Sequence, residues 1–204
     1  MLRGRTDLKA IFNLGAGVDA ILQLGDNLPQ GVPLIRVDDA GMGVQMAEYV
    51  SHAVLRHFRR FDEYDALQAD TQWRPLPPHR KEDFSIGILG LGVLGHCIID
   101  GLRSFGFPLL GWSRSAKQID GVQCFHGDDG LDAFLSQTKV LVLILPLTKE
   151  TENLMDKDKL AKLKQGAYIV NVARGAHIVE DDLLALIQQG HIAGATLDVF
   201  REEP

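Results

Sequence analysis

The sequence has few of the features that mark secreted, membrane-spanning or nucleic-acid-binding proteins. Its only two cysteines, Cys97 and Cys124, form neither a CxxC pair nor a metal-ligand spacing, so we expect no disulfide framework and no metal site. No apolar run reaches the roughly 18–20 residues needed to cross a bilayer, and no secretory segment follows Met1. A net charge of −6 and a pI near 5.6 argue against nucleic acid or an anionic membrane as partner. Together these absences favour a cytoplasmic protein.

What remains is the composition of a globular protein, with 46% hydrophobic and 24% charged residues. A length of 204 residues allows one complete domain of about 100–150 residues and part of another. Strand-like runs lie close to both ends, at residues 10–14 and just before Pro204, where a domain border is not expected. We therefore expect truncation at both ends, with a partial domain over residues 1–43 and a dinucleotide-binding domain over residues 44–204.

Short apolar runs of strand length alternate with amphipathic stretches of helix length along the chain, which is typical of a parallel sheet covered by helices. A long helix is expected over residues 44–67, and its basic cluster of Arg56, Arg59 and Arg60 is interpreted as a solvated face. From residue 84 the alternation predicts an α/β, doubly wound parallel sheet of the Rossmann type, which binds ligands at the carboxyl ends of its strands. The expected strands are 9–14, 33–37, 84–90, 108–113, 122–125, 140–145, 167–172 and 194–199, and the other expected helices are 18–24, 93–105, 129–137, 157–163 and 180–189.

A Gly-x-Gly-x-x-Gly pattern follows the first strand of this core directly and opens a helix. Gly90 permits the tight turn, Gly92 lets the backbone approach a pyrophosphate, and Gly95 allows close packing of helix on strand. The amides of Val93 and Leu94 then lie at the positive end of the helix dipole, where phosphate binds. Such glycines also serve as plain turn and packing residues, but the strand before and the helix after favour a dinucleotide.

The end of the second core strand indicates which dinucleotide is bound. NAD enzymes place an acidic residue there, about twenty residues after the glycine loop, and this sequence has Ser113, Arg114 and Ser115 instead. One permanent positive charge and two hydroxyl donors suit the 2′-phosphate of NADP. NADP (NADPH) is therefore the predicted cofactor and NAD the less favoured one, the alternative being an exposed arginine at a strand end.

Two further segments follow the fifth and sixth strands of the core at the same sheet edge. They are residues 171–175 (Asn-Val-Ala-Arg-Gly) and residues 197–204 (Leu-Asp-Val-Phe-Arg-Glu-Glu-Pro). The guanidinium of Arg174 could bind a substrate carboxylate and polarise a neighbouring keto oxygen. It could equally be a structural residue that bonds loop carbonyls, and the residues alone leave both interpretations open.

With these segments in view, the chain resembles the D-2-hydroxyacid dehydrogenase family, and within it the bacterial glyoxylate/hydroxypyruvate reductase A branch. The resemblance covers essentially the whole chain. It rests on the glycine loop, on the two segments just quoted, and on residues 13–19 (Asn-Leu-Gly-Ala-Gly-Val-Asp), 59–64 (Arg-Arg-Phe-Asp-Glu-Tyr) and 145–148 (Leu-Pro-Leu-Thr).

The resemblance implies roles for residues around the cofactor. The aspartate of the Leu-Asp-Val-Phe segment, here Asp198, would orient the nicotinamide amide. Pro146 and Ala173, which lie within two of the matching segments, would also contact the cofactor. Residues 1–43 would then be the remnant of a second, flavodoxin-like substrate domain.

The resemblance also implies the substrate and the reaction. Arg174 would bind the 2-keto acid, the backbone around Ala16 and Gly17 would hold its carboxylate, and Glu203 would support a catalytic histidine. The implied enzyme is an NADPH-dependent oxidoreductase that reduces glyoxylate or hydroxypyruvate to the hydroxy acid by hydride transfer. Family members commonly dimerise through the cofactor domain, so a homodimer is expected, with the helix at 44–67 contributing.

Two departures from the family pattern limit that expectation. The family's catalytic histidine would lie beyond the position of Pro204, and the first part of the substrate domain would precede Met1. Of the seven histidines in the chain, none occupies the family position, although His177 stands three residues after Arg174. We therefore expect impaired turnover, and the alternative is a non-catalytic chain that binds nucleotide or associates with other subunits through apolar side chains of residues 1–43.

Overall fold

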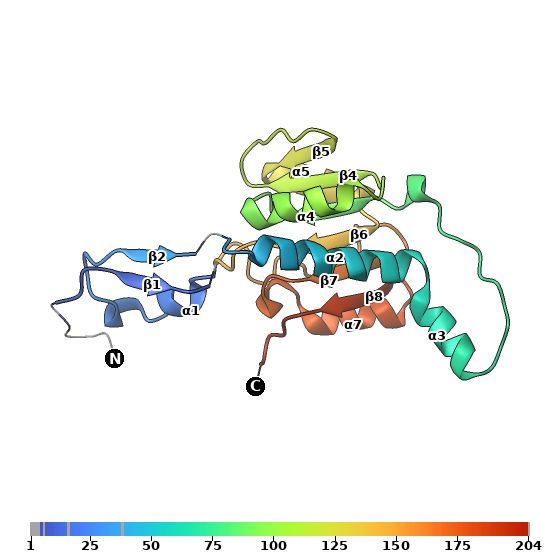
Figure 1. Ribbon diagram of the computed structural model, residues 1–204, viewed down its shortest axis with the longest axis horizontal. Helices are drawn as coiled ribbons and strands as arrows, with labels where there is room; N and C mark the ends of the chain where they lie inside the picture. The colour runs from blue at the N-terminus through green and yellow to red at the C-terminus, as the bar shows by residue number, and fades with distance from the viewer. Residues whose placement is uncertain (1–4, 6, 16, 38, 204) are drawn as a thin grey trace.

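A small and a large β-sheet organise the chain in a computed structural model, which describes residue 5 and residues 7–15, 17–37 and 39–203. The small sheet is built by β1 (Ile11–Asn13) and β2 (Leu34–Arg36), which pair in parallel. Between them lie α1 (Asp19–Leu22) and the single 3-10 turn η1 (Gly25–Asn27). These elements form an arm that projects from the main body of the molecule (Figure 1).

The main body is a six-stranded, wholly parallel sheet with the order β5-β4-β3-β6-β7-β8. This order confirms the predicted doubly wound Rossmann-type fold, because the chain reverses direction across the sheet between β3 and β6. The strands are β3 (Ile86–Leu89), β4 (Leu109–Ser113), β5 (Val122–His126), β6 (Val140–Leu143), β7 (Ala167–Asn171) and β8 (Ile192–Leu197).

Helices cover both faces of this sheet and bury two apolar cores. One core lies under α2 (Met42–Phe58) and α4 (Val93–Arg103), which pack against each other and contribute Val50, Val54 and Ile98. The other lies under α5 (Gly127–Gln137), α6 (Lys157–Leu160) and α7 (Glu180–Gln188). All side chains of β3, β4, β6 and β7 are buried, as expected for strands covered on both faces.

The predicted single helix over residues 44–67 is wrong. Two helices replace it, α2 and α3 (Phe61–Ala69), because Arg60 adopts a left-handed conformation with φ 58° that ends the first helix. Arg60 donates to Glu63 in α3 and to the carbonyl of Pro77 (2.8 Å), and Arg56 pairs with Asp62 and Asp65. Two of the three arginines interpreted as a solvated face therefore hold this corner in ion pairs.

A long loop leads from α3 to the 3-10 turn η2 (Lys81–Asp83) and into β3 (Figure 1). A third 3-10 turn, η3 (Gly175–His177), follows β7. Within the part of the chain that the structure describes, no helix combines the length and the apolar character that crossing a membrane requires. The proposed division of the chain at residue 43 stays a prediction.

Candidate functional site

The glycine loop lies at the carboxyl end of β3, where the strand order reverses. Gly90 has φ 124°, and a Cβ on it would lie 2.9 Å from the carbonyl oxygen of Ile144 after β6. A Cβ on Gly95 would lie 2.0 Å from the carbonyl oxygen of Gly90, so α4 can approach the strand only with glycine there. Two of the three predicted glycines are thus required by close backbone contacts.

Gly92 serves a different purpose, because a Cβ on it would meet nothing within 4 Å. The space above the loop is therefore open rather than filled by a neighbouring chain. Gly92 is the N-cap of α4, and within the described part of the chain this helix has no side-chain cap hydrogen bond. Uncapped amides at a helix N-terminus are the kind of donors that bind phosphate, so this arrangement of Val93 and Leu94 is compatible with the predicted pyrophosphate site.

The loop after β4 lies beside the glycine loop. Arg114 and Ser115 are exposed, whereas Ser113 is buried and its hydroxyl donates to the carbonyl of Ser115 (2.8 Å). Lys117 donates to the carbonyl of Leu91 (2.7 Å) and so fastens this loop to the glycine loop. The positive charge of Arg114 also contributes to lowering the pKa of Glu150, after hydrogen bonds to Thr148 and the Glu150 backbone. Arg114 therefore lies between two loops of the same sheet edge.

Arg174 joins the main body to the arm. Its Nη2 lies 2.9 Å from Oδ1 of Asp19 in α1, and its Nε lies 3.2 and 3.1 Å from the two carboxylate oxygens of Asp19. Gly17 allows this approach, since a Cβ there would lie 1.7 Å from Nη2. The guanidinium holds the pKa of Asp19 below its usual value, chiefly through these hydrogen bonds. The structure thus brings together Gly17 and Arg174, both predicted substrate residues, and adds Asp19.

Several contacts fix the backbone on which Arg174 stands. Nη1 of Arg174 donates to the carbonyl of buried Ala173 (2.7 Å). The side-chain Nδ2 of Asn171 donates to the carbonyl of Arg174 (3.0 Å). The ring nitrogens of His177 lie 3.1 Å from the carbonyl of Arg174 and 3.3 Å from that of Pro146. Burial lowers the pKa of His177, so the ring is neutral at pH 7 and its single N–H donates to one of these carbonyls. His177 therefore links the two loops.

The other predicted site residues lie at or near the same edge. Asp198 is exposed directly after β8, and its backbone N–H donates to the carbonyl of Asn171 (3.0 Å). Pro146 follows β6. Glu203 is exposed and accepts from the backbone N–H of Phe200 (3.1 Å), so it makes a local contact. Ala16, the remaining substrate residue, lies outside the described residues.

Sequence reasoning missed three residues that shape this site: Asp19, Lys117 and Asn171. No local pattern assigns a role to Asp19, because its partner Arg174 is 155 positions away. Lys117 lies two residues after the Ser-Arg-Ser segment at 113–115, and its partner Leu91 is remote in sequence. Asn171 is the first residue of the segment 171–175 that contains Arg174. An asparagine at the end of a strand often forms side-chain hydrogen bonds with the neighbouring backbone, and this signal could have identified it.

A glycine loop at the point where the strand order of a doubly wound parallel sheet reverses is typical of dinucleotide-binding Rossmann domains. The family model for D-isomer specific 2-hydroxyacid dehydrogenase, NAD binding domain, matches residues 51–204. The chain belongs to this family.

Individual relatives agree with that assignment. The chain is 53% identical over 208 residues to a glyoxylate/hydroxypyruvate reductase A of Serratia proteamaculans, covering 100% of this chain and 66% of the relative. It is 44% identical, with a TM-score of 0.92, to a D-isomer specific 2-hydroxyacid dehydrogenase of Xanthobacter autotrophicus crystallised with NADPH and MES, covering 98% of this chain and 62% of the other.

An NADPH-dependent glyoxylate/hydroxypyruvate reductase of Sinorhizobium meliloti, crystallised with NADP and sulfate, is also similar, with 40% identity and a TM-score of 0.91. That likeness covers 97% of this chain and 63% of the other. The chain thus spans just under two thirds, 66%, of the length of the curated relatives that it matches.

Proposed function

We propose that this chain supplies the cofactor-binding part, and the substrate-binding arginine, of an NADPH-dependent reductase of small 2-keto acids such as glyoxylate and hydroxypyruvate. The observation that carries the proposal is that three predicted binding elements lie at the same edge of the large sheet. The glycine loop, Arg114 and Arg174 all follow the carboxyl ends of strands in one parallel sheet. The names of the relatives support the same substrates and cofactor.

The residues present fit a dinucleotide. The open space over Gly92 and the uncapped amides of α4 suit its pyrophosphate. A side chain in place of Gly90 or Gly95 would collide with nearby backbone and distort the loop. Arg114 has no hydrogen-bonded partner among the described residues and is free to receive a 2′-phosphate. When bound, NADPH would supply the hydride. Asp198, Pro146 and Ala173 would contact its nicotinamide half.

Arg174 would act on the keto acid by charge. A planar guanidinium binds a carboxylate in a bidentate manner and also stabilises negative charge that develops on a neighbouring oxygen. Asp19 now makes a contact of this kind with the Nε and Nη2 side of the fork. A substrate carboxylate held there, beside the backbone at Gly17, would compete with Asp19 for the same donors.

We also propose that the 204 residues assayed by themselves turn over slowly. A proton donor must lie within hydrogen-bond reach of the substrate oxygen. Although His177 stands closest to Arg174 in sequence, it is buried with 0% exposure, and both ring nitrogens face backbone carbonyls. His57 and His79 lie near the start of β3, at the opposite edge of the sheet. Among the described residues, Glu203 contacts the backbone N–H of Phe200 and no imidazole.

A nucleotide titration followed by nicotinamide fluorescence tests the cofactor assignment. Substituting Arg114→Ala should weaken NADPH binding roughly 10- to 150-fold, because a charge-assisted hydrogen bond contributes about 1.5–3 kcal/mol. NADH lacks the 2′-phosphate and provides the internal control, since its affinity should not change. Equal losses for both nucleotides would remove Arg114 as the selector.

An assay of NADPH oxidation with glyoxylate tests the catalytic part separately. We expect nucleotide binding with turnover far below that of the longer relatives, and a further loss in Arg174→Met. A rate similar to that of the relatives would contradict the proposed shortage of a proton donor. Failure to bind either nucleotide would contradict the proposal as a whole.

A further inference from the structure

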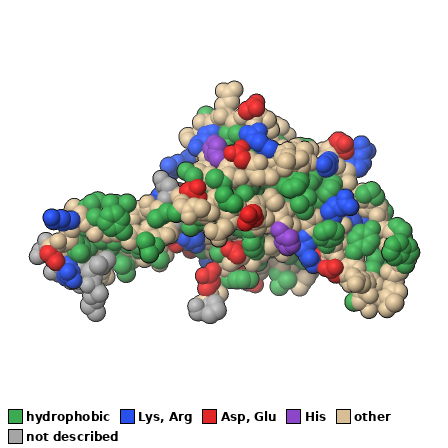
Figure 2. Space-filling model, viewed as in Figure 1, with side chains coloured by type: hydrophobic (Ala, Val, Ile, Leu, Met, Phe, Trp, Pro, Cys, Tyr) green, Lys and Arg blue, Asp and Glu red, His purple; other side chains and the backbone are tan. Residues whose placement is uncertain are grey.

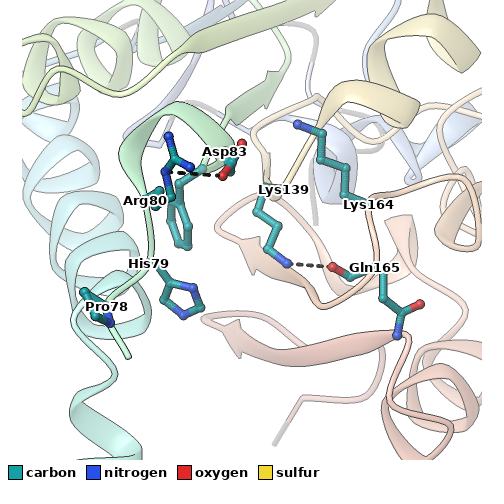
Figure 3. Close-up of a pocket in the computed structure, with 8 residues that line it drawn as sticks. Pro78, His79, Arg80, Asp83, Lys139, Lys164 and Gln165 are labelled. Atoms are coloured by element: carbon teal, nitrogen blue, oxygen red, sulfur yellow. Dashed lines mark hydrogen bonds and ion pairs between the residues drawn. The ribbon is translucent and has the colours of Figure 1, made fainter. Parts of the chain in front are cut away.

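A second concave site lies at the opposite edge of the large sheet, where the strands begin. Its cavity has a volume of about 480 Å³ and lies between the loop leading into β3 and the segments that precede β6 and β7 (Figure 3). Because these are amino ends of strands, the cavity is separate from the glycine loop and Arg174 at the carboxyl ends. The lining residues are Pro78, His79, Arg80, Asp83, Phe84, Lys139, Lys164 and Gln165.

Two lysines form one wall of this cavity. Lys139 and Lys164 are both partly buried, and Figure 3 shows Lys139 pointing toward Gln165 and Lys164 pointing away from it, both across from the loop that carries His79 and Arg80. The ammonium group of Lys139 donates to the carbonyl of Gln165 (2.6 Å), and that of Lys164 donates to the hydroxyl of Ser85 (3.2 Å). These neutral acceptors hold the side chains in place without cancelling their charge.

The charge on this wall exceeds that of the one carboxylate, Asp83, among the residues that line the cavity. Neither Lys139 nor Lys164 has a carboxylate partner among the residues that the structure describes. On the facing loop, Arg80 lies 3.6 Å from Glu82 and 3.9 Å from Asp83, so its charge is largely balanced. Burial, and then the charge of Lys164, lower the pKa of Lys139, which indicates that the two ammonium groups repel each other. An anion in the cavity would offset that repulsion.

One histidine lines the cavity, and two more with unpartnered ring nitrogens lie close to it. His79 lines the cavity, and the ring of His57 lies 5.8 Å from the ring of His79. Nε2 of His57 is buried and has no hydrogen-bond partner among the described residues, and the same holds for Nε2 of His191. His191 is next to the cavity because its Nδ1 lies 3.0 Å from Oε1 of Gln165. Buried polar atoms without partners are uncommon and need an explanation.

We propose that this cavity is a binding site for a small molecule that carries a multiply charged oxyanion group such as a phosphate. Two ammonium groups supply the charge, and lysine commonly binds phosphate as a point charge. The volume exceeds what a single phosphate needs, so the cavity has room for an organic part of the ligand beside Phe84 and His79. Nothing in this site depends on the proposed cofactor or on Arg174.

Amide chemical shifts of the ¹⁵N-labelled 204-residue chain, titrated with pyrophosphate at constant ionic strength, test the proposal. Saturating shifts are expected for the amides of Phe84, Gln165 and Gly166, which lie at the cavity. The amides of Val93 and Leu94 report separately on anion binding at the glycine loop. The same spectra show whether each variant is folded.

Substitutions identify the cations. Lys139→Gln and Lys164→Gln should each weaken binding at the cavity roughly 10-fold, because each removes one charge-assisted hydrogen bond. Lys164→Arg keeps the charge and should retain most of the affinity. Lys157→Gln removes the same charge from an exposed position in α6 and should change nothing.

Three outcomes would overturn the proposal. They are shifts confined to the glycine loop, shifts at the cavity that rise linearly without saturation, and saturating shifts that survive both lysine-to-glutamine substitutions. Saturation at the cavity that is lost in both glutamine variants and kept in Lys164→Arg and Lys157→Gln would support it.

Discussion

At the scale of single residues, the contact between Asp19 and Arg174 is the feature with the widest consequences. It joins the arm to the main body, and it occupies the donors that the proposed substrate would use. The side chain of Asp19 is 20% exposed and that of Arg174 is 40% exposed, so solvent screens the pair only partly. A partly buried, bidentate pair of this type contributes about 1 kcal/mol.

A double-mutant cycle with Asp19→Asn and Arg174→Met measures that contribution. We expect a coupling free energy of about 1 kcal/mol in urea unfolding at neutral pH, reduced at high salt. Because folding lowers the pKa of Asp19, the stabilisation is present above the ordinary value of 3.8 and is lost as pH falls through the lowered value. Asp26→Asn, at an exposed acid of the same segment, is the matched control and should show no coupling to Arg174. Zero coupling in the first cycle would mean that the pair is only a geometric coincidence.

The sequence was informative about residues whose role is local. The Gly-x-Gly-x-x-Gly spacing predicted the loop, and the predicted reasons for glycine are confirmed at Gly90 and Gly95, whereas the reason given for Gly92 stays a prediction. Ser113 and Arg114 stand where NAD enzymes place an acidic residue, and this local difference predicted NADP as the cofactor. The contact of Asp19 with Arg174 was not, since it forms only when the arm folds back onto a loop 155 positions later. The hydrogen bond from Lys117 to the carbonyl of Leu91 was missed for the same reason, because the two residues are 26 positions apart.

At the scale of elements, periodicity predicted each strand of the main sheet to within a few residues, because their apolar runs are short and uninterrupted. The corner between α2 and α3 was missed for a physical reason. Its helical pattern continues through Arg59 and Arg60, and only contacts with Glu63 and the carbonyl of Pro77 favour the left-handed conformation at Arg60. Pro77 lies 17 positions further on, beyond the reach of any local pattern.

The relative stabilities of Arg60→Gly and Arg60→Ala show whether residue 60 lies at a corner between two helices or inside a continuous helix. Both Arg60→Gly and Arg60→Ala lose the contacts with Glu63 and Pro77, so both should be less stable than the unchanged chain. At φ 58° alanine is strained and glycine is not, so Arg60→Gly should be the more stable of the two by about 1 kcal/mol.

Within a continuous helix the order would be reversed, with alanine favoured by about 1 kcal/mol. Thermal unfolding of the two variants, compared at one pH and salt concentration, gives the sign directly. A matched pair at Glu48, an exposed position inside α2, should show the helical order with alanine favoured.

At the scale of the whole molecule, burial is very uneven. Both cores lie in the main body, and the described residues of the arm include no fully buried side chain. Figure 2 shows hydrophobic side chains gathered on the surface of the arm. Of the six apolar residues predicted to be exposed in residues 1–43, Phe12, Leu14, Leu22 and Ile35 are confirmed, with 69%, 89%, 58% and 42% exposure, whereas Ile11 and Ile21 are half-buried. The predicted homodimer stays a prediction, and an apolar surface of this kind is consistent with association.

The main body therefore determines most of the stability, and one histidine makes it sensitive to acid. His57, near the end of α2, stacks on Tyr168 with ring centroids 4.2 Å apart. Burial, and then the charges of His79 and Lys139, lower its pKa from 6.5 to about 4. Between these two values the unfolded chain binds a proton that the folded chain does not. The free energy of unfolding must therefore fall as pH falls from 6.5 to about 4, and this contribution is constant below that.

His57→Phe tests this contribution because it keeps an aromatic ring against Tyr168 and removes the titrating group. Urea unfolding at pH 6.5 and at pH 4.5 should show a loss of stability in the unchanged chain that exceeds the loss in His57→Phe by roughly 1–3 kcal/mol. His52→Gln, at an exposed position of the same helix, should lose as much as the unchanged chain. If His57→Phe loses as much stability as the unchanged chain over this interval, His57 is charged in the folded protein, and acid acts through other groups such as His177, whose pKa burial also lowers.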